Sequence, residues 1–244
     1  MKAVILAAGI ASRLRPLTND KPKCLLEIGN RCLLERAIDG LLLHQVDEII
    51  IVTGYLKELI ETFVKTKYPA LSVQFIYNEV YASTNNIYSL WLALPAILHE
   101  KEFLLLDSDI LYDPEIIRLL QESPYENSLA LDAHHLGEEE IKVITNEKNQ
   151  IIEISKTCSI EKAIGESIGI EKISGSYLTA LYGELSQMIT VEKLDNIFYE
   201  RAFERLIPQG YYFYPVNTSK YFSMELDTVE DFRNAVKQIP KHLL

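Results

Sequence analysis

The sequence has few of the features that assign a chain to a membrane or a secreted class. No apolar run among its 244 residues approaches the length of a membrane span, and no secretory pattern opens the chain. We therefore expect a cytoplasmic protein with no membrane partner. Its three cysteines, Cys24, Cys32 and Cys158, have neither zinc-ligand spacing nor the even number of a disulfide framework, so we interpret them as reduced packing residues.

Basic residues are scarce as well. Lys and Arg total 24 against 35 Asp and Glu, and the formal net charge of −11 argues against a general nucleic-acid binder. The Gly-x-x-x-x-Gly-Lys-Ser/Thr spacing of P-loop enzymes is missing, and Gly9 has no glycine neighbours at dinucleotide-binding spacing. No repeat, low-complexity tract or Pro/Gly-rich linker divides the chain, so we expect residues 1–244 to form a single domain.

Apolar runs alternate with helical periodicity through the first half of the chain. This β–α–β rhythm predicts an α/β, Rossmann-like, mainly parallel sheet with helices on both faces. Later strands extend that sheet or form a small added β lid region. The expected strands are 2–6, 48–52, 73–77, 103–106, 128–132, 141–145 and 150–154, and the expected helices are 33–44, 56–65 and 86–98, with a further helix from Pro114 and a last one after Thr228.

The amino-terminal strand opens into a loop of small residues. Ala7, Ala8 and Gly9 leave room for backbone N–H groups to approach a ligand, and the guanidinium of Arg13 and the ammonium of Lys23 follow. Basic side chains gather here in an otherwise acidic chain, which favours a local anion site completed by metal ions. The alternative is an ordinary turn with surface cations.

Four short strings carry a family resemblance: Leu6-Ala7-Ala8-Gly9, Ser12-Arg13-Leu14, Pro16-Leu17-Thr18 and Pro22-Lys23. Together they resemble the signature of the sugar-1-phosphate and phosphocholine nucleotidyltransferases. Ala11 stands where that signature usually carries glycine, and Ser12 stands where threonine is common. Because a Cβ atom disfavours positive φ, Ala11 implies either a locally different loop or accepted strain.

The resemblance implies roles for individual residues. The catalytic cations would be Arg13, Lys23 and Lys156, the last of which looks like the family lysine that contacts the acceptor phosphate; Lys142 is a weaker rival. The nucleotide-binding residues would be Leu6, Ala7, Ala8, Gly9, Ser12, Arg13, Asn85, Asn86 and Ser108.

Two carboxylates, Asp107 and Asp109, follow a fully apolar strand and would share one face if the segment stays extended. Oxygen ligands of this kind suit Mg²⁺, which we expect as the cofactor. The alternative is that one of them caps the helix after Pro114. A second acidic pair, Glu225 and Asp227, lies near the end of the chain. The resemblance makes Asp227 the distant metal partner of Asp109, and Asp227 or Thr228 is also placed to cap the last helix.

The stretch from Tyr81 to Trp91 mixes amides with aromatic residues. Asn85 or Asn86 would read the nucleobase, or Asn86 would simply cap the helix, and the residues leave both readings open. The stretch looks more like the phosphocholine cytidylyltransferase branch than the sugar branches, which favours CTP as the nucleotide. The candidate acceptor-binding residues are Tyr81, Tyr88, Tyr112, Asp132, Glu171 and Glu225, of which the aromatic ones would enclose a quaternary ammonium unless they belong to the core.

The expected reaction is therefore transfer of CMP from CTP to a phosphorylated small molecule such as phosphocholine, with release of pyrophosphate. No histidine has a catalytic role in it. Two alternatives remain: a UTP- or GTP-dependent sugar-1-phosphate nucleotidyltransferase, and a non-catalytic nucleotide or ligand sensor on the same fold. The residues leave the acceptor and the oligomeric state undetermined.

Overall fold

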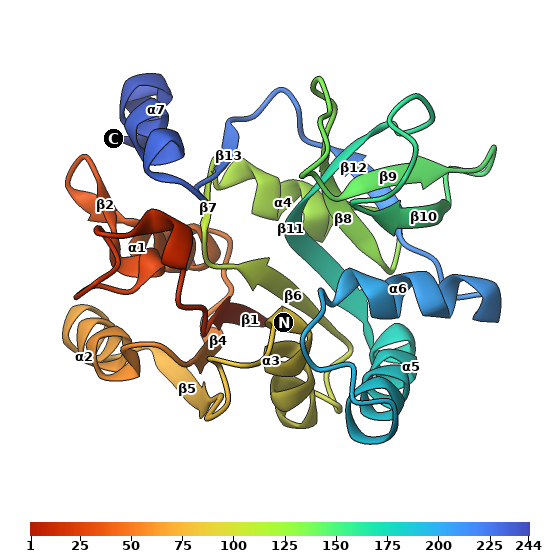
Figure 1. Ribbon diagram of the computed structural model, residues 1–244, viewed down its shortest axis with the longest axis horizontal. Coiled ribbons are helices and arrows are strands. Elements are labelled where there is room, and N and C mark those ends of the chain that lie inside the picture. The colour runs from red at the N-terminus through yellow and green to blue at the C-terminus, as the bar shows by residue number, and fades with distance from the viewer.

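A mixed sheet of nine strands forms the centre of the computed structural model, which describes residues 1–244 (Figure 1). Its path runs β10-β9-β11-β6-β1-β4-β5, and β8 and β12 attach beside β11. The four strands of the amino-terminal half are parallel: β1 (Lys2–Ala7), β4 (Glu48–Thr53), β5 (Ser72–Tyr77) and β6 (Glu102–Asp107). All four were predicted, and the sheet confirms the expected fold class.

The remaining strands of the sheet come from the middle and the end of the chain. β11 is antiparallel to β6, β8 and β9, while β12 runs parallel to β8. The three later strands predicted from the sequence are present, and they extend the main sheet. The five strands are β8 (Ser128–Asp132), β9 (Lys142–Thr145), β10 (Ile151–Ser155), β11 (Gly165–Ser174) and β12 (Tyr214–Asn217).

Helices cover both faces because the sheet strands bury alternate residues in opposite directions. Ala3 and Ile5 of β1 pack in the core beneath α1, α2 and α4, whereas Val4 and Leu6 pack beneath α3, α5 and α6. The helices of the first face are α1 (Leu33–Leu43), α2 (Lys57–Lys67) and α4 (Glu115–Glu122). Those of the second face are α3 (Asn86–Ala93), α5 (Gly175–Ser186) and α6 (Glu200–Leu206).

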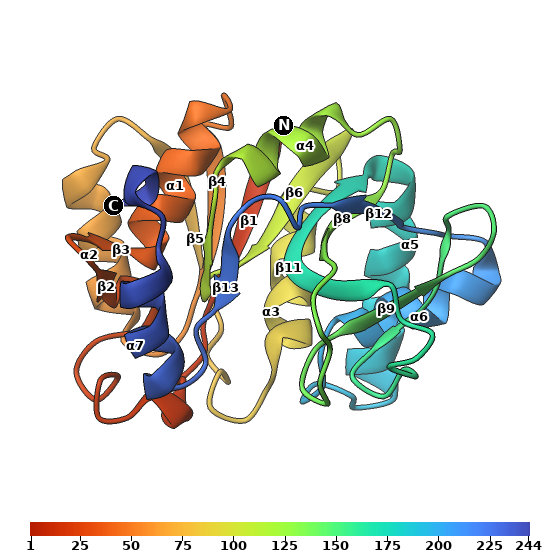
Figure 2. The same cartoon turned by 90° about the horizontal axis from the view of Figure 1, so that it is seen from above.

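A third, smaller core lies under the carboxyl-terminal helix α7 (Val229–Gln238). Phe232 and Ile239 pack there against Leu14 and Leu26 from the amino-terminal segment. Figures 1 and 2 both place α7 beside α1 and the β2–β3 hairpin, far from α5 and α6. Two small sheets flank this core: β2 (Glu27–Ile28) with β3 (Arg31–Cys32), and β7 (Ile110–Tyr112) with β13 (Ser223–Glu225).

The other helical segments are single turns. They span Ser12–Leu14, Lys23–Leu25, Leu94–Ala96, Gln187–Val191, Ile207–Gln209 and Lys241–Leu243. None of the helices combines the length and the apolar character that crossing a membrane requires. All three cysteines are free and buried.

Candidate active site

A cavity of about 1000 Å³ opens where β1 and β6 end. In open α/β sheets, ligands bind beyond the carboxyl ends of the parallel strands, and this cavity lies at that edge. Its walls come from the loops after β1, β5 and β6, from β11, and from the segments before α6 and α7.

The loop after β1 forms one wall of the cavity. Leu6, Ala7, Ala8, Gly9, Ser12 and Arg13 all line it, as do Asn85, Asn86 and Ser108. Ala11 takes the left-handed conformation, with φ of 51°, and its carbonyl accepts a 3.0 Å hydrogen bond from the hydroxyl of Thr18. The chain therefore keeps the turn that glycine favours and accepts the cost of the Cβ atom.

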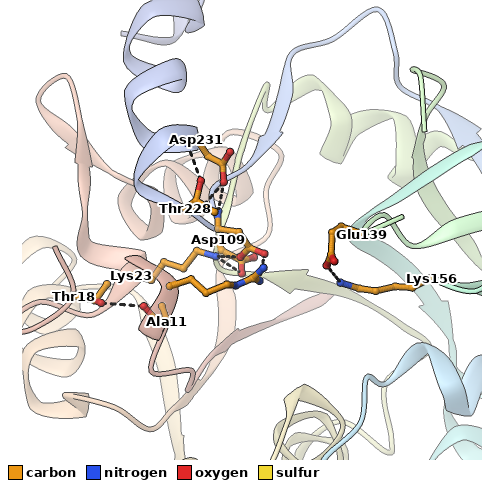
Figure 3. A network of polar contacts seen from close by, with 10 residues as sticks. Ala11, Thr18, Lys23, Asp109, Glu139, Lys156, Thr228 and Asp231 are labelled. Atoms are coloured by element: carbon orange, nitrogen blue, oxygen red, sulfur yellow. Dashed lines mark hydrogen bonds and ion pairs between the residues drawn. The ribbon is translucent and has the colours of Figure 1, made fainter. Parts of the chain in front are cut away.

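Lys23 bridges two carboxylates from distant parts of the chain (Figure 3). Its ammonium lies 2.9 Å from an oxygen of Asp109 and 2.6 Å from an oxygen of Asp227, and Arg13 also pairs with Asp227. Burial opposes the charge on Lys23, but the two carboxylates outweigh it and raise its pKa. Burial likewise opposes ionisation of Asp227, and the attraction of Lys23 and Arg13 lowers the pKa of that carboxyl.

Three carboxylates form the candidate metal centre: Asp109, Glu225 and Asp227 each offer an oxygen within 4.8 Å of the others. A set of hard oxygen donors fits Mg²⁺. Glu225, which the sequence assigned to the acceptor, belongs to this trio. Burial and the neighbouring carboxylates Asp109 and Asp227 raise the pKa of Glu225 to about 8, and the charge of Lys23 opposes this shift only in part.

Asp107 lies outside this trio, contrary to the prediction of a metal ligand. It is the last residue of β6, and its carboxylate accepts a 3.2 Å hydrogen bond from the hydroxyl of Tyr199. The chain turns at Ser108 and Asp109 before β7, so the two aspartates do not share one face of a continuous strand. Neither caps α4, because the side chain of Asp113 accepts from the backbone N–H of Glu115.

The β7–β13 pair holds the metal centre together. Glu225 stands opposite Ile110, and the N–H of Leu226 donates to the carbonyl of Asp109 at 3.1 Å. Directly after this pair, Thr228 begins α7 with a capping box shared with Asp231. Thr228, rather than Asp227, is therefore the cap of α7, and the carboxylate of Asp227 faces the cations.

The amides of Asn85 and Asn86 have structural partners through their oxygens. Oδ1 of Asn85 accepts from the N–H of Asn86 at 2.8 Å, which makes Asn85 the cap of α3. Oδ1 of Asn86 accepts from the N–H of Tyr199 at 3.0 Å. Neither Nδ2 group has a protein partner, so both remain as donors at the cavity.

The opposite wall of the cavity carries Lys156. Its ammonium lies 3.2 Å from Glu139 and 5.0 Å from the ring centre of Phe198, and Figure 3 shows it across the cavity from Lys23. Its rival Lys142 is buried and donates to the carbonyls of Gly137, Glu138 and Glu140, at 3.2 Å each. Lys142 therefore supports this loop and does not face the cavity.

The predicted acceptor-binding residues divide into two groups. Tyr81 and Asp132 line the cavity, whereas Glu171 is fully buried behind it. Two assignments are wrong. Tyr88 packs on Trp91 with ring centres 5.4 Å apart, and Tyr112 is only 5% exposed in the core beneath α1 and α4. Both aromatic rings serve packing because their strand and helix turn them towards the core.

Comparison with known proteins places this geometry in a family. The model of the MobA-like NTP transferase domain matches residues 3–153, which include the amino-terminal loop, Lys23 and Asp109. The chain belongs to this family of NTP transferases. The resemblance inferred from the amino-terminal signature is thereby confirmed.

Several characterised NTP transferases resemble the chain. It is 45% identical over 92 residues to the choline-phosphate cytidylyltransferase of Streptococcus pneumoniae, an alignment that spans 38% of each protein. It is 28% identical over 228 residues to the CTP:phosphoglutamine cytidylyltransferase of Campylobacter jejuni, covering 85% of this chain and 88% of that one. The crystal structure of a CTP:phosphocholine cytidylyltransferase from Streptococcus pneumoniae superposes with a TM-score of 0.81 at 23% identity, covering 98% and 99% of the two chains, which shows a shared fold.

Several residues that line the NTP transferase cavity could not be identified from sequence patterns. They are His134, Glu139, Glu166, Phe198 and Glu200. All of them except Phe198 are charged or titratable residues that belong to no motif. Glu200 is also the first residue of a seven-residue helix, which is too short to show a clear apolar period. Only the excess of acidic residues over the whole chain hinted that some carboxylates would lie inside.

Proposed function

We propose that the protein transfers a cytidylyl group from CTP to the phosphate of a small molecule and releases pyrophosphate. The observation that carries this proposal is the convergence of Lys23, Asp109 and Asp227 at one cavity whose other wall is the small-residue loop after β1. Cations and metal-binding carboxylates beside one loop suit a triphosphate, which needs both charge neutralisation and close backbone approach.

The proposed reaction is an in-line displacement. An oxygen of the acceptor phosphate attacks the α-phosphorus of CTP, the bond from that phosphorus to the bridging oxygen breaks, and pyrophosphate leaves with the electron pair. The acceptor phosphate is already a nucleophile, so no protein base is required. Catalysis then consists of positioning two anions and stabilising the charge that develops between them.

Individual residues have distinct roles in this proposal. Arg13 and Lys23 bind the triphosphate, and Lys156 holds the acceptor phosphate on the opposite wall. Asp109, Glu225 and Asp227 would hold Mg²⁺, which supplies Lewis-acid stabilisation of phosphate oxygens when bound. Lys23 pairs with Asp109 and Asp227, and Arg13 pairs with Asp227. Lys23 and Arg13 are therefore close enough to turn towards phosphate oxygens when a triphosphate binds.

The choice of CTP rests on the relatives, which include cytidylyltransferases for choline phosphate, phosphoglutamine and 2-aminoethylphosphonate. The free Nδ2 donors of Asn85 and Asn86 are compatible with it, since the O2 and N3 atoms of cytosine are acceptors. Uridylyltransferases and guanylyltransferases for sugar phosphates are also among the relatives. Transfer from UTP or GTP to a sugar-1-phosphate is accordingly the second candidate.

The test is a grid of nucleoside triphosphates against phosphorylated acceptors, with Mg²⁺ present and pyrophosphate release as the signal. The grid crosses CTP, UTP, GTP and ATP with choline phosphate, 2-aminoethylphosphonate, phosphoglutamine and glucose-1-phosphate. Activity confined to the CTP row supports the proposal, and activity in the UTP or GTP row with the sugar phosphate supports the second candidate. Silence throughout contradicts both and favours a ligand sensor.

The metal centre makes a separate prediction. Asp109→Asn removes one anionic oxygen donor from the trio, so the Mg²⁺ concentration for half-maximal rate should rise about tenfold or more. A titration of the rate with Mg²⁺ measures this shift. Asp113→Asn is the matched control, because that carboxylate caps α4 and lies outside the trio. An unchanged Mg²⁺ requirement in Asp109→Asn would contradict the assignment.

A further inference from the structure

Two carboxylates lie against the hydroxyl of Tyr199 beside the cavity, and a third is on the next residue of the chain. That hydroxyl lies 3.2 Å from Asp107 and 3.3 Å and 3.4 Å from the two oxygens of Glu171. Glu200 follows Tyr199 in the chain, and its charge acts on both Asp107 and Glu171. Asp107 and Glu200 line the cavity, and Glu171 lies fully buried behind them. We call these three residues the acidic pocket.

The acidic pocket has too few donors and no cation of its own. One tyrosine hydroxyl supplies one proton, which can satisfy either Asp107 or Glu171 but not both. No lysine, arginine or histidine forms an ion pair with any of the three residues. The cation that acts on Glu200 from nearby is Lys156, and its ammonium pairs with Glu139.

Glu200 provides a second, independent observation. It is 5% exposed, and its Oε2 atom has no hydrogen-bond partner in the protein. A buried carboxylate oxygen without a donor costs free energy, because it has lost water and gained nothing in return. Its residue lines the cavity, so a bound molecule is able to supply the missing donor.

Burial disfavours the ionised form of a carboxyl unless a cation accompanies it. Burial comes first among the causes that raise the pKa of Glu171 and Glu200, and it raises that of Glu200 to about 7. An incoming cation reverses this balance because it favours the ionised form. The pocket is thus suited to a positively charged group and penalises a neutral or an anionic one.

The aromatic composition of the cavity indicates which kind of cation fits. Quaternary ammonium groups are recognised by cages of several aromatic faces. Only two phenylalanine, tyrosine or tryptophan side chains line the cavity, and one of them, Tyr81, packs beside Tyr55 and Ala8 on the nucleotide side. The other, Phe198, lies on the acceptor side, and the buried ring of Tyr199 does not line the cavity. Carboxylate oxygens, in contrast, match the N–H donors of a primary ammonium.

We propose that the acceptor is a small phosphate or phosphonate that carries a protonated primary amine, which Glu200 binds directly, with Asp107 beside it at the cavity and Glu171 behind. The proposal rests on the proposed cytidylyl transfer. Lys156 lies over Phe198, two residues before Glu200, so the phosphate and the amine of the acceptor are held close together. A short carbon chain between them suits this spacing.

Three acceptors that differ only at the far end test the proposal: 2-aminoethyl phosphate, its N,N,N-trimethyl derivative and 2-hydroxyethyl phosphate. Each is assayed with CTP and Mg²⁺ by pyrophosphate release. The primary amine should have the highest kcat/KM, by about tenfold or more over each of the others. Equal or faster reaction of the trimethylated or the hydroxyl acceptor would overturn the proposal.

Glu200→Gln tests the residue itself. It should lower kcat/KM for 2-aminoethyl phosphate about ten- to hundredfold, mainly through KM, and change that for 2-hydroxyethyl phosphate little. Glu161→Gln is the control and should leave both values near those of the wild type, since Glu161 is exposed in a turn and does not line the cavity. An equal loss for both acceptors in Glu200→Gln would mean a structural role and would overturn the assignment.

Two further measurements test the acidic pocket independently of Glu200→Gln and of turnover. If Glu200→Gln does not fold, Glu171→Gln takes its place, with the same expected preference for loss of the amine acceptor. If no triphosphate and acceptor yield pyrophosphate, the proposed function fails, and calorimetric titration of the wild type decides the pocket separately. Tighter binding of 2-aminoethyl phosphate than of 2-hydroxyethyl phosphate would support the acidic pocket, and equal or absent binding would overturn it.

Discussion

At the scale of single residues, Lys23 combines two tasks. It is 9% exposed and neutralises Asp109 and Asp227, and the proposed reaction then requires the same ammonium at the triphosphate. The backbone that carries it sits in a helical turn preceded by Pro22, whose fixed φ restricts the loop. The position of this charge is therefore set by the chain before any substrate binds.

Lys23→Ala should lower kcat by about 10²- to 10³-fold, because it removes a positioned charge from the proposed transition state. The protein should stay folded, since Asp109 and Asp227 are partly exposed and can be hydrated. Steady-state kinetics and circular dichroism check the two statements. Lys21→Ala, which removes an exposed lysine paired with Glu27, is the control. A Lys23→Ala enzyme with normal turnover would remove Lys23 from the mechanism.

Glu200 makes the stability of the ligand-free protein depend on pH. Burial raises its pKa from 4.5 to about 7, so the folded state holds a proton that the unfolded chain releases between these values. A raised pKa of an acid means that stability present at low pH is lost as the pH rises across this window, by about 1.4 kcal/mol per pH unit at most.

The comparison of wild type with Glu200→Gln measures this effect. From pH 5 to pH 8, the free energy of unfolding of the wild type should fall relative to that of Glu200→Gln, by up to about 3 kcal/mol. Urea unfolding at the two pH values gives the difference. Parallel pH profiles for the two proteins would show that Glu200 titrates normally in the folded state.

At the scale of elements, β11 is the strand that shapes the acceptor side. Gly169 has a φ of +73°, and its pairing with β8 shifts between Ser167 and Glu171. A Cβ atom at Gly169 would lie 2.7 Å from an oxygen of Asp107. The irregularity thus lets Asp107 approach β11 and brings Glu171 behind the cavity.

Gly169→Ala should destabilise the protein by about 1–3 kcal/mol, because it combines positive φ with a clash against Asp107. Gly183→Ala is the matched control: it lies in α5 with no atom near its Cβ position, and helix propensity predicts a gain of about 0.5–1 kcal/mol. Thermal unfolding distinguishes the two. Equal effects of the two substitutions would contradict the strain attributed to β11.

The elements of the first half of the chain could be predicted because their apolar runs and helical stripes are uninterrupted. β4 and β5 follow from the runs 48–52 and 73–77, for example. β11 could not, because Glu171 and Lys172 are buried charges and Gly169 interrupts the strand. Glu171 of this strand belongs to the acidic pocket. A polar residue at a buried position breaks the apolar pattern by which a strand is predicted.

At the scale of the whole molecule, the candidate site joins residues more than 200 positions apart, such as Lys23 and Asp227. Their proximity was predicted by the resemblance, not by periodicity, since no local pattern reports a contact of that range. The grouping of Glu225, and not Asp107, with Asp109 and Asp227 could not be predicted, because it depends on a turn at Ser108 that an apolar strand sequence does not reveal.

We propose that residues 1–244 unfold as one domain, with the three cores melting together. Trp91, the single tryptophan, lies on α3 beside the largest core and reports on that core by fluorescence, whereas far-ultraviolet circular dichroism reports on all helices. The two signals should give coincident urea transitions. Separate midpoints would show that the core under α7 or another part melts independently.

The β7–β13 pair has a consequence for how this architecture diversifies. This antiparallel pair keeps Asp109 close to Glu225 and Asp227. The N–H of Asp113 donates to the carbonyl of Phe222 at 2.8 Å, so the segment between these two residues begins and ends at the same place. That segment contains Lys156, Glu171 and Glu200. Substitutions in that segment can change the preference for the acceptor without displacing the carboxylates that the β7–β13 pair positions. The residues proposed to bind the nucleotide would then stay unchanged.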